Sequence, residues 1–386
     1  MGPAEDTEAA ASVGCPRGIP LQAAPSGPRS EGPGAVAAVQ SGQVIALLGP
    51  TGVGKTGVAI ALSRRLGVRV ISCDSMQMYG GLPLLTNQPS EKERRLAPHE
   101  LVGTLDPTAS CSAVEYAALA RPLIDDDIRL RGWALLSGGT GLYMRAALAP
   151  LQAAPTDDPD LRRRLESCAA NEGPGALHAR LARLDPEAAA RIDLRNVRRV
   201  VRALEVVTTK GTAWSGRDDL WKPRYFHRTL VVGLTMERQA LHAAIDRRAA
   251  AMLAGGAVEE VREHRSLARL AGSEGTATAQ GSLESPRGSE CQNAPERLGA
   301  LEGRGLCQAI GYREICRYLD GLQGLDQTIQ EVAGATRRYA RRQETWLRKV
   351  KDAVIIDVQG RTADEISEEI LSLARSGSDQ EERSTP

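Results

Sequence analysis

Short apolar runs typical of buried strands alternate along the chain with longer segments whose apolar residues have helical spacing. The strand-like runs are Val44–Leu48, Val68–Cys73, Trp133–Ser137, Thr229–Leu234 and Val354–Asp357. Helical spacing is clearest at residues 57–66, 112–131, 237–263 and 363–374. Parallel strands need a crossover connection, which is usually a helix. The pattern therefore predicts an α/β fold built on a parallel sheet.

One helical stretch interrupts this alternation. The pattern is almost purely helical over residues 156–222, and strand character returns only near Thr229. We therefore predict that residues 43–155 and 223–375 form one α/β core, and that residues 156–222 form a helical domain inserted into it.

Three further segments have the composition of disordered chain. Residues 1–42 are rich in Ala, Gly and Pro, residues 266–304 in Gly, Ser, Glu and Ala, and residues 376–386 in Ser, Asp and Glu. Such segments bury too little apolar surface to offset the entropy of ordering. We expect a disordered N-terminal extension, a mobile insertion and a disordered tail.

The composition is that of a soluble globular protein. Of the 386 residues, 42% are hydrophobic and 25% are charged, and the formal net charge is +1. This balance excludes a uniformly basic surface but allows local basic patches. Only 3% of residues are aromatic, which leaves few rings for a stacking platform that binds single-stranded RNA.

The cysteines and the apolar runs indicate a cytoplasmic protein. The seven cysteines are scattered, without a C-x-x-C pair or histidines at zinc-finger spacing. No apolar run reaches membrane-spanning length, and the first residues lack a basic stretch followed by an apolar one. We expect a cytoplasmic monomer with reduced thiols and no membrane segment.

A glycine-rich loop joins the first strand-like run to the first helix. It fits the pattern G-x-x-x-x-G-K-[ST] with Gly49, Pro50, Thr51, Gly52, Val53, Gly54, Lys55 and Thr56. Strand, loop and helix in this order are the context of a phosphate-binding P-loop. Loop amides and the helix N-terminus would surround phosphate oxygens, Lys55 would supply positive charge, and Thr56 would hold Mg²⁺. The alternative, an ordinary glycine-rich turn, does not explain this context.

A candidate catalytic carboxylate follows the second strand-like run. Asp74 should face the P-loop, because the carboxyl ends of neighbouring parallel strands share one crevice. It could be a second Mg²⁺ ligand of an ATPase, a general base beside a bound pyrophosphate, or a carboxylate that caps a turn.

The strand-like run at 133–137 ends without an acidic residue. Gly138 and Gly139 follow it, where a P-loop ATPase would carry an Asp that holds Mg²⁺. Their presence weakens the prediction of ATP hydrolysis. We expect backbone groups and the Thr140 hydroxyl to approach the ligand instead.

Two stretches concentrate positive charge. Arg195, Arg198, Arg199 and Arg202 recur at helical spacing, and residues 336–349 form the densest basic run, with a Tyr and a Trp among its cations. A charged stripe is usually a solvated helix face, but such a run also attracts a phosphate backbone. Charge alone leaves both interpretations open.

Taken in order, these motifs resemble those of the tRNA dimethylallyltransferases, or IPP transferase family, of bacterial type. The resemblance spans about residues 43–358 and rests on the P-loop and on these further residues: Asp74, Ser75, Gln77, Tyr79, Gly138–Tyr143, Arg199, Arg202–Glu205, Gly311–Arg313, Thr336, Arg337, Arg341, Arg342, Gln343, Trp346 and Leu347. It implies transfer of a dimethylallyl group from dimethylallyl diphosphate to the exocyclic amine of the adenosine on the 3′ side of the anticodon, in tRNAs that read codons beginning with U.

The resemblance also implies roles in that reaction. Diphosphate is the leaving group, and Lys55, the loop amides, Thr51 and Mg²⁺ on Thr56 would bear its developing charge. Asp74 would take the proton of the adenine amine, with Thr140 as a further catalytic contact. The target base would have to leave its stack to reach the crevice. Arg248 matches a family arginine near the diphosphate.

Further residues align with family segments that touch the anticodon stem-loop of tRNA, which makes phosphate contact the preferred interpretation of both basic stretches. These residues are Asp74, Ser75, Met76, Gln77, Thr140, Arg198, Arg199, Val200, Val201, Arg202, Gln308, Gly311, Tyr312, Arg313, Arg337, Arg341, Arg342 and Gln343.

Three other functions stay open at this point. The chain could be a P-loop nucleotide kinase, an enzyme that prenylates free AMP or ADP, or an RNA-binding switch without catalysis. The first two do not need the long basic surface at 336–349, and the third does not need Asp74.

Overall fold

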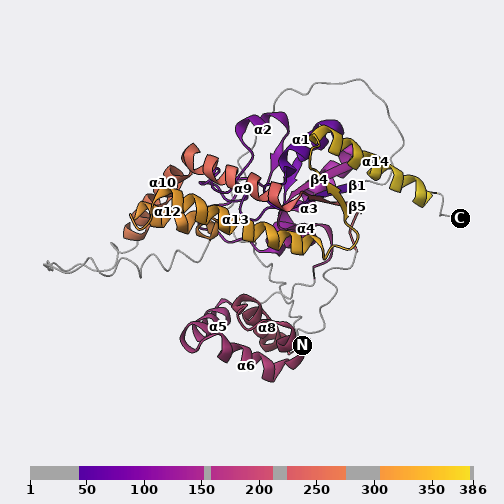
Figure 1. The fold of residues 1–386 in the computed structure, drawn as a ribbon. Helices are drawn as coiled ribbons and strands as arrows, with labels where there is room; N and C mark the ends of the chain where they lie inside the picture. The colour runs from indigo at the N-terminus through magenta and orange to yellow at the C-terminus, as the bar shows by residue number, and fades with distance from the viewer. Residues whose placement is uncertain (1–42, 152–157, 212–223, 275–304, 383–386) are drawn as a thin grey trace, which may run out of the picture. The chain divides into compact units, whose positions relative to one another are not determined.

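The computed structural model describes residues 43–151, 158–211, 224–274 and 305–382. Its centre is a six-stranded parallel sheet (Figure 1). In sheet order the strands are β3 (His99–Glu100), β2 (Val70–Ser72), β4 (Trp133–Gly138), β1 (Gln43–Leu48), β5 (Arg228–Thr235) and β6 (Val354–Asp357). The predicted parallel α/β fold is confirmed.

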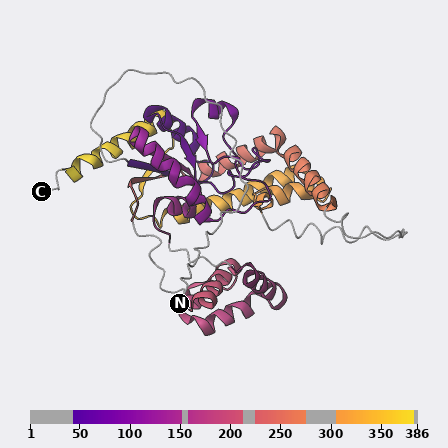
Figure 2. The same cartoon turned by 180° about the vertical axis from the view of Figure 1, so that it is seen from behind.

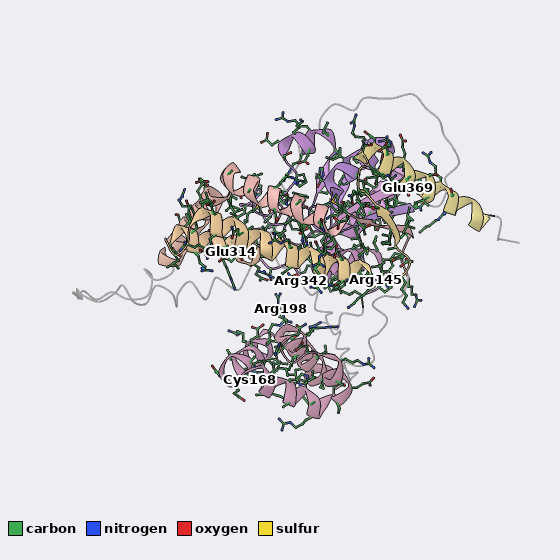
Figure 3. All side chains as sticks on the ribbon, viewed as in Figure 1. Arg145, Cys168, Arg198, Glu314, Arg342 and Glu369 are labelled. Atoms are coloured by element: carbon green, nitrogen blue, oxygen red, sulfur yellow. The ribbon has the colours of Figure 1, made fainter. Side chains whose placement is uncertain are left out.

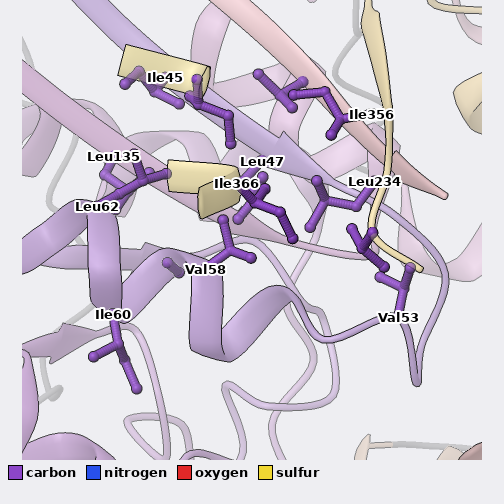
Figure 4. Packing of buried hydrophobic residues seen from close by; sticks show 14 of the residues in the cluster. Ile45, Leu47, Val53, Val58, Ile60, Leu62, Leu135, Leu234, Ile356 and Ile366 are labelled. Atoms are coloured by element: carbon purple, nitrogen blue, oxygen red, sulfur yellow. The ribbon is translucent and has the colours of Figure 1, made fainter. Parts of the chain in front are cut away.

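The central strand β1 is buried on both faces. Ile45 and Leu47 belong to one hydrophobic cluster, which Figure 4 shows, while Val44, Ala46 and Leu48 belong to another on the opposite face. A strand covered on both faces is apolar at successive positions rather than at alternate ones. This is why β1 can be recognised in the sequence as a continuous apolar run.

Two pairs of helices cover the two faces of the sheet. The first cluster includes residues of α1 (Lys55–Leu66) and α14 (Ala363–Glu382), and the second includes residues of α3 (Ala113–Arg131) and α4 (Gly141–Leu148). Figures 1 and 2 show the two sides. The short α2 (Glu91–Leu96) begins at Ser90, whose side chain accepts a hydrogen bond from the Glu93 amide.

Further helices pack around a third cluster beside the sheet. They are α9 (Arg238–Met252), a π-helical turn (Leu253–Ala257), α10 (Val258–Glu274), a 3₁₀ turn (Gly305–Gln308), α12 (Tyr312–Leu319) and α13 (Leu325–Leu347). The sequence predicts one helix over 237–263, but Gly256 divides it with a φ of 112°. Residues other than glycine rarely adopt that backbone conformation.

The helical insertion has its own hydrophobic core. It consists of α5 (Pro159–Glu172), α6 (Pro174–Leu184), α7 (Pro186–Arg191) and α8 (Val197–Lys210). Leu165, Leu177, Leu181 and Leu204 are among its buried residues. The predicted helical character of residues 156–222 is confirmed for the part that the structure describes.

Two segments predicted to be disordered are helical in their first residues. Helix α10 continues through Glu274, into the segment predicted as a mobile insertion, and α14 continues through Glu382, into the predicted tail. Each extension contains one glycine, Gly272 or Gly377, and no proline. A single glycine opposes a helix by only about 1 kcal/mol, so this composition does not by itself end a helix. The expectations for 1–42, for the rest of the insertion and for 383–386 lie outside the described residues. Within the described ranges, no helix is long and apolar enough to cross a membrane.

Candidate active site

The P-loop leaves the carboxyl end of β1 and leads into α1. Gly52 and Gly54 have φ values of 91° and 94°, which favour glycine. At Gly49 a Cβ atom would lie 2.8 Å from the Leu234 carbonyl oxygen, so no larger residue fits without a shift of the backbone. The sequence prediction of a glycine-dependent loop before a helix is confirmed.

Lys55 is folded back onto this loop. Its Nζ atom donates hydrogen bonds to the carbonyl oxygens of Gly49 and Pro50, both at 2.9 Å. Burial lowers the pKa of Lys55 to about 8, although the nearby Asp74 carboxylate opposes this shift. A phosphate oxygen at the loop would favour the charged form, because it would supply a second negative partner.

Asp74 lies beyond the end of β2 and is partly exposed to the same space. Its Oδ1 atom accepts a hydrogen bond from the Met76 amide at 3.0 Å. Burial raises the pKa of Asp74, while that amide and Lys55 oppose the rise. The prediction that Asp74 faces the P-loop is confirmed, and its position suits a carboxylate that exchanges a proton.

The end of β4 supports the Asp74 segment. The Ser75 amide donates to the Thr140 hydroxyl at 3.1 Å, and the Thr140 amide donates to the Cys73 carbonyl oxygen at 3.2 Å. A Cβ atom on Gly138 would lie 2.5 Å from the Cys73 carbonyl carbon. Glycine there lets the two strand ends approach closely, which places Thr140 beside Asp74.

Gln343 on α13 joins the P-loop to the end of β4. Its side-chain oxygen accepts a hydrogen bond from the Thr51 amide at 2.8 Å, and its nitrogen donates to the Gly139 carbonyl oxygen at 3.1 Å. A Cβ atom on Gly139 would collide with that nitrogen. Gln343 is buried, so the structure gives it a supporting role at this site, and its expected contact with tRNA stays a prediction.

Arg248 on α9 contacts the P-loop at Thr51. Its Nη2 atom donates to the Thr51 hydroxyl at 2.6 Å. Burial lowers the pKa of Arg248 and the Asp74 carboxylate opposes this. Two cations, Lys55 and Arg248, therefore stand beside one loop, as a site for a multiply charged anion requires.

A cavity of about 210 Å³ opens between the P-loop, α9 and α13. Asp74, Thr51 and Arg248 form its polar end, and the other lining residues are Ser75, Met76, Leu85, Thr86, Asn87, Ile245, Ala249, Met252, Gln308, Ala309, Ile310, Val332, Thr336, Tyr339 and Arg342. Sequence reasoning missed the apolar wall from α9 and α13. The sequence predicts these helices from their periodicity, but it does not show which face of each helix lines a cavity.

The α13 arginines predicted to bind tRNA differ in their surroundings. Arg341 and Arg342, the latter labelled in Figure 3, are exposed. Arg337 forms an ion pair with Asp246 of α9. Arg341 is thus directly available to a phosphate backbone, whereas Arg342 also lines the cavity.

The segment between the 3₁₀ turn and α12 is partly structural. Gly311 has a φ of 100°, and a Cβ atom there would lie 2.9 Å from Leu85. Tyr312 is buried, and its hydroxyl lies 2.9 Å from His264 Nδ1. Gln308 and Arg313 are exposed, so these two carry the predicted RNA-facing surface.

The α8 residues predicted to bind tRNA are partly exposed and partly buried. Arg198, labelled in Figure 3, and Arg199 are exposed, whereas Val200 and Val201 belong to the core of the insertion. Any tRNA contact by these two valines would involve their backbone.

A buried carboxylate holds the next arginine of α8. Arg202 donates to the buried Glu205 at 3.1 Å, and Arg162 of α5 donates two hydrogen bonds to the same carboxylate at 2.6 and 2.8 Å. Arg202 therefore stabilises the insertion as well as facing solvent in part.

Gln77 is joined to Asn87, which lines the cavity. The Gln77 side chain donates to the Asn87 carbonyl oxygen at 2.6 Å and lies 3.0 Å from the Ser72 hydroxyl. Ser75 and Met76 line the cavity directly. Ser75 and Met76 therefore share the cavity with Asp74, and their expected contact with tRNA stays a prediction.

The donor set at the P-loop fits Mg²⁺ that is shared with a ligand. Among the described residues, no group of three His, Cys, Asp or Glu side chains could hold a metal ion. Thr56 sits in the first turn of α1, beside the loop. Mg²⁺ characteristically takes few protein oxygens and completes its shell with phosphate oxygens and water, which is the situation Thr56 offers.

Binding of inorganic diphosphate is expected to take up a proton at Lys55. Its free pKa of about 8 means that much of the population is neutral at pH 9, and the anion binds the charged form. Proton uptake should therefore be large at pH 9 and small at pH 6.5, and affinity should fall as pH rises above 8.

Calorimetry in buffers of different ionisation enthalpy measures this uptake. Lys55→Met corrects for titration of diphosphate itself, and equal uptake in both proteins would contradict the assignment.

Comparisons with known proteins agree with this geometry. A family model described as "IPP transferase" matches residues 77–350, and one described as "Isopentenyl transferase" matches residues 42–96. The tRNA dimethylallyltransferase of Anaeromyxobacter dehalogenans is 40% identical over 81% of this chain and 94% of its own length. That of Geobacillus kaustophilus is 39% identical over 79% and 87%.

Solved structures give the same result. The tRNA isopentenylpyrophosphate transferase of Bacillus halodurans has a TM-score of 0.59 and 31% identity, covering 88% of this chain and 98% of its own. A eukaryotic dimethylallyltransferase acting on tRNA has a TM-score of 0.65 and 25% identity, covering 83% and 75%.

Proposed function

The chain belongs to the IPP transferase family, and we propose that it is a tRNA dimethylallyltransferase. It transfers the dimethylallyl group of dimethylallyl diphosphate to the exocyclic amine of the adenosine 3′-adjacent to the anticodon, in tRNAs that read codons beginning with U, and releases diphosphate.

The observation that carries this proposal is the pairing of a P-loop with Asp74 at one cavity. Lys55 and Arg248 stand on the loop side, and Asp74 lines the same space. Strand β4 ends with Gly138 and is followed by Gly139, where ATP hydrolysis would need a carboxylate. The site therefore suits departure of a diphosphate beside a base, rather than attack of water on a phosphate.

The loop side serves the donor. Charge develops on the diphosphate as the allylic carbon–oxygen bond breaks, and Lys55, the loop amides and Arg248 are placed to stabilise it. Mg²⁺ held by Thr56 would supply further positive charge to the leaving group when bound. The apolar wall from Ile245, Ala249 and Met252 suits the hydrocarbon part of the donor.

The Asp74 side serves the acceptor. The adenine amine is a weak nucleophile, because its lone pair is delocalised into the ring. As nitrogen attacks the allylic carbon it becomes acidic, and the Asp74 carboxylate takes its proton. Thr140 holds the Asp74 segment through the Ser75 amide.

Mass spectrometry of nucleosides tests the proposal. An unmodified anticodon stem-loop is incubated with protein, Mg²⁺ and dimethylallyl diphosphate, with AMP and ADP as alternative acceptors. We expect adenosine in the stem-loop to gain one dimethylallyl group and the mononucleotides to stay unmodified. Prenylation of AMP alone, or phosphate transfer from ATP to a nucleoside, would replace this proposal with one of its rivals.

Arg341→Ala is expected to weaken binding of the stem-loop and to reduce the slope of log K against log salt by about one unit, because one phosphate contact is lost. Binding titrations over a range of salt concentrations measure this. Arg95→Ala on α2 is the matched control, since Arg95 is 79% exposed and its ion pair within the described residues is with Glu91, four residues before it. Equal slopes for the two variants would exclude Arg341 from the RNA surface.

A further inference from the structure

The cavity beside Asp74 has an aromatic wall that the mechanism above does not use. Among the described residues that line it, the aromatic ring is that of Tyr339. Tyr339 and Gln343 lie one turn apart on the same face of α13. Because Gln343 ties this turn to the P-loop and to Gly139, the ring is held in a fixed place relative to Asp74.

The Tyr339 ring already carries a cation on one side. The Arg342 guanidinium carbon lies 5.3 Å from the ring centroid, within the range of a cation–π interaction. The Tyr339 phenol is neutral near pH 7, as in an ordinary tyrosine, and burial and the Asp74 carboxylate raise its pKa further. Both residues line the cavity, so an aromatic ring and a guanidinium group stand together in its wall.

Two parts of the reaction could use such a ring, a positively charged allylic carbon or the flat adenine. A second positive charge at this ring would be repelled by Arg342, whereas a neutral base would not. Bases stack on aromatic rings and on arginine planes alike. The observations therefore favour the base.

We propose that Tyr339, backed by Arg342, is the surface on which the target adenine stacks, so that its exocyclic amine is held against Asp74. This inference rests on the proposed function and names the residue that orients the acceptor in it.

The first test compares kcat/KM for an anticodon stem-loop among variants. Tyr339→Leu is expected to lower it by about 5- to 150-fold, which corresponds to about 1–3 kcal/mol per stacked base. Tyr339→Phe keeps the ring but loses the hydrogen bonds of the phenol with Thr140 and Gln343, so its loss should be clearly smaller than that of Tyr339→Leu, and KM for dimethylallyl diphosphate should not change. Tyr318→Leu on α12, outside the cavity lining, is the matched control and should behave as wild type.

The second test reads stacking directly in the wild-type protein. A stem-loop with 2-aminopurine at the target position binds but cannot react, because this base lacks the amine at C6. Its fluorescence should be quenched in the complex with wild type and with Tyr339→Phe, and should rise with Tyr339→Leu. Strong fluorescence in the wild-type complex would overturn the proposal even if Tyr339→Leu fails to fold.

Three further results would decide between the explanations. A loss in Tyr339→Phe equal to that in Tyr339→Leu would assign the effect to the hydroxyl and overturn stacking. Unchanged kcat/KM in Tyr339→Leu, with an active wild type, would do the same. A wild type that prenylates no stem-loop would instead refute the proposed function itself.

Discussion

Asp74→Ala is expected to lower kcat for prenyl transfer by about 10²–10⁴-fold, the usual contribution of a positioned general base. Asp74 lines the cavity opposite the P-loop cations, so its removal leaves the attacking nitrogen without a proton acceptor. Single-turnover kinetics with bound stem-loop measure the chemical step, and filter binding should show tRNA affinity within a few-fold of wild type.

The pH profile makes this prediction more specific. Since burial raises the pKa of Asp74, the rate should fall on acidification at a pH above the ordinary range for aspartate, because protonated Asp74 cannot act as a base. Asp74→Asn should share the loss, and Asp326→Ala, at an exposed aspartate of α13, should not. Normal turnover in Asp74→Asn would remove Asp74 from the mechanism.

Lys55→Met is expected to lower kcat by about 10²–10³-fold, comparable to the loss of one donor that stabilises developing charge. The Lys55 ammonium is placed at the loop, where the diphosphate must accumulate charge as the carbon–oxygen bond breaks. Rapid-quench measurement of diphosphate release gives this rate.

The loss should come without unfolding. Burial disfavours the Lys55 charge in the folded protein, as its lowered pKa shows, so a neutral side chain of similar length should not reduce the melting temperature. Arg64→Met removes an exposed cation from the same helix and should leave both quantities unchanged. A lower melting temperature in Lys55→Met would mean that the lysine acts through stability.

Features encoded by neighbouring residues could be predicted from the sequence. The strands, the P-loop and the position of Asp74 depend on short apolar runs and on the rule that parallel strand ends share one edge. The buried stretch Val44–Leu48, followed by Gly49 and Lys55, is enough to predict a strand, a loop and a helix in this order.

Features that depend on contacts between distant residues could not be predicted from the sequence. Thr51 and Gln343 are 292 positions apart, and no local pattern indicates that a glutamine in a basic run turns inward to a loop amide. In the sequence, Tyr339 is simply one of the two aromatic residues in the basic run 336–349, and nothing local indicates that it lines a cavity. The family resemblance places both Arg199 and Val200 at the RNA, but in the structure Arg199 is exposed and Val200 lies in the core of the insertion.

The break at Gly256 shows a related limit. A glycine within a helical pattern is often tolerated, so the sequence favours one helix over 237–263. The left-handed backbone at Gly256 instead turns α10 away from α9, which lets α10 pack against α12 around Val261 and Ile315.

The most direct measurement compares two products in one reaction that contains protein, Mg²⁺, anticodon stem-loop, dimethylallyl diphosphate and ATP. We expect diphosphate from the prenyl donor to appear in equal amount with dimethylallyladenosine in the RNA, while ATP is not consumed. Consumption of ATP without use of the prenyl donor would contradict the claim that this P-loop holds a departing diphosphate beside a base.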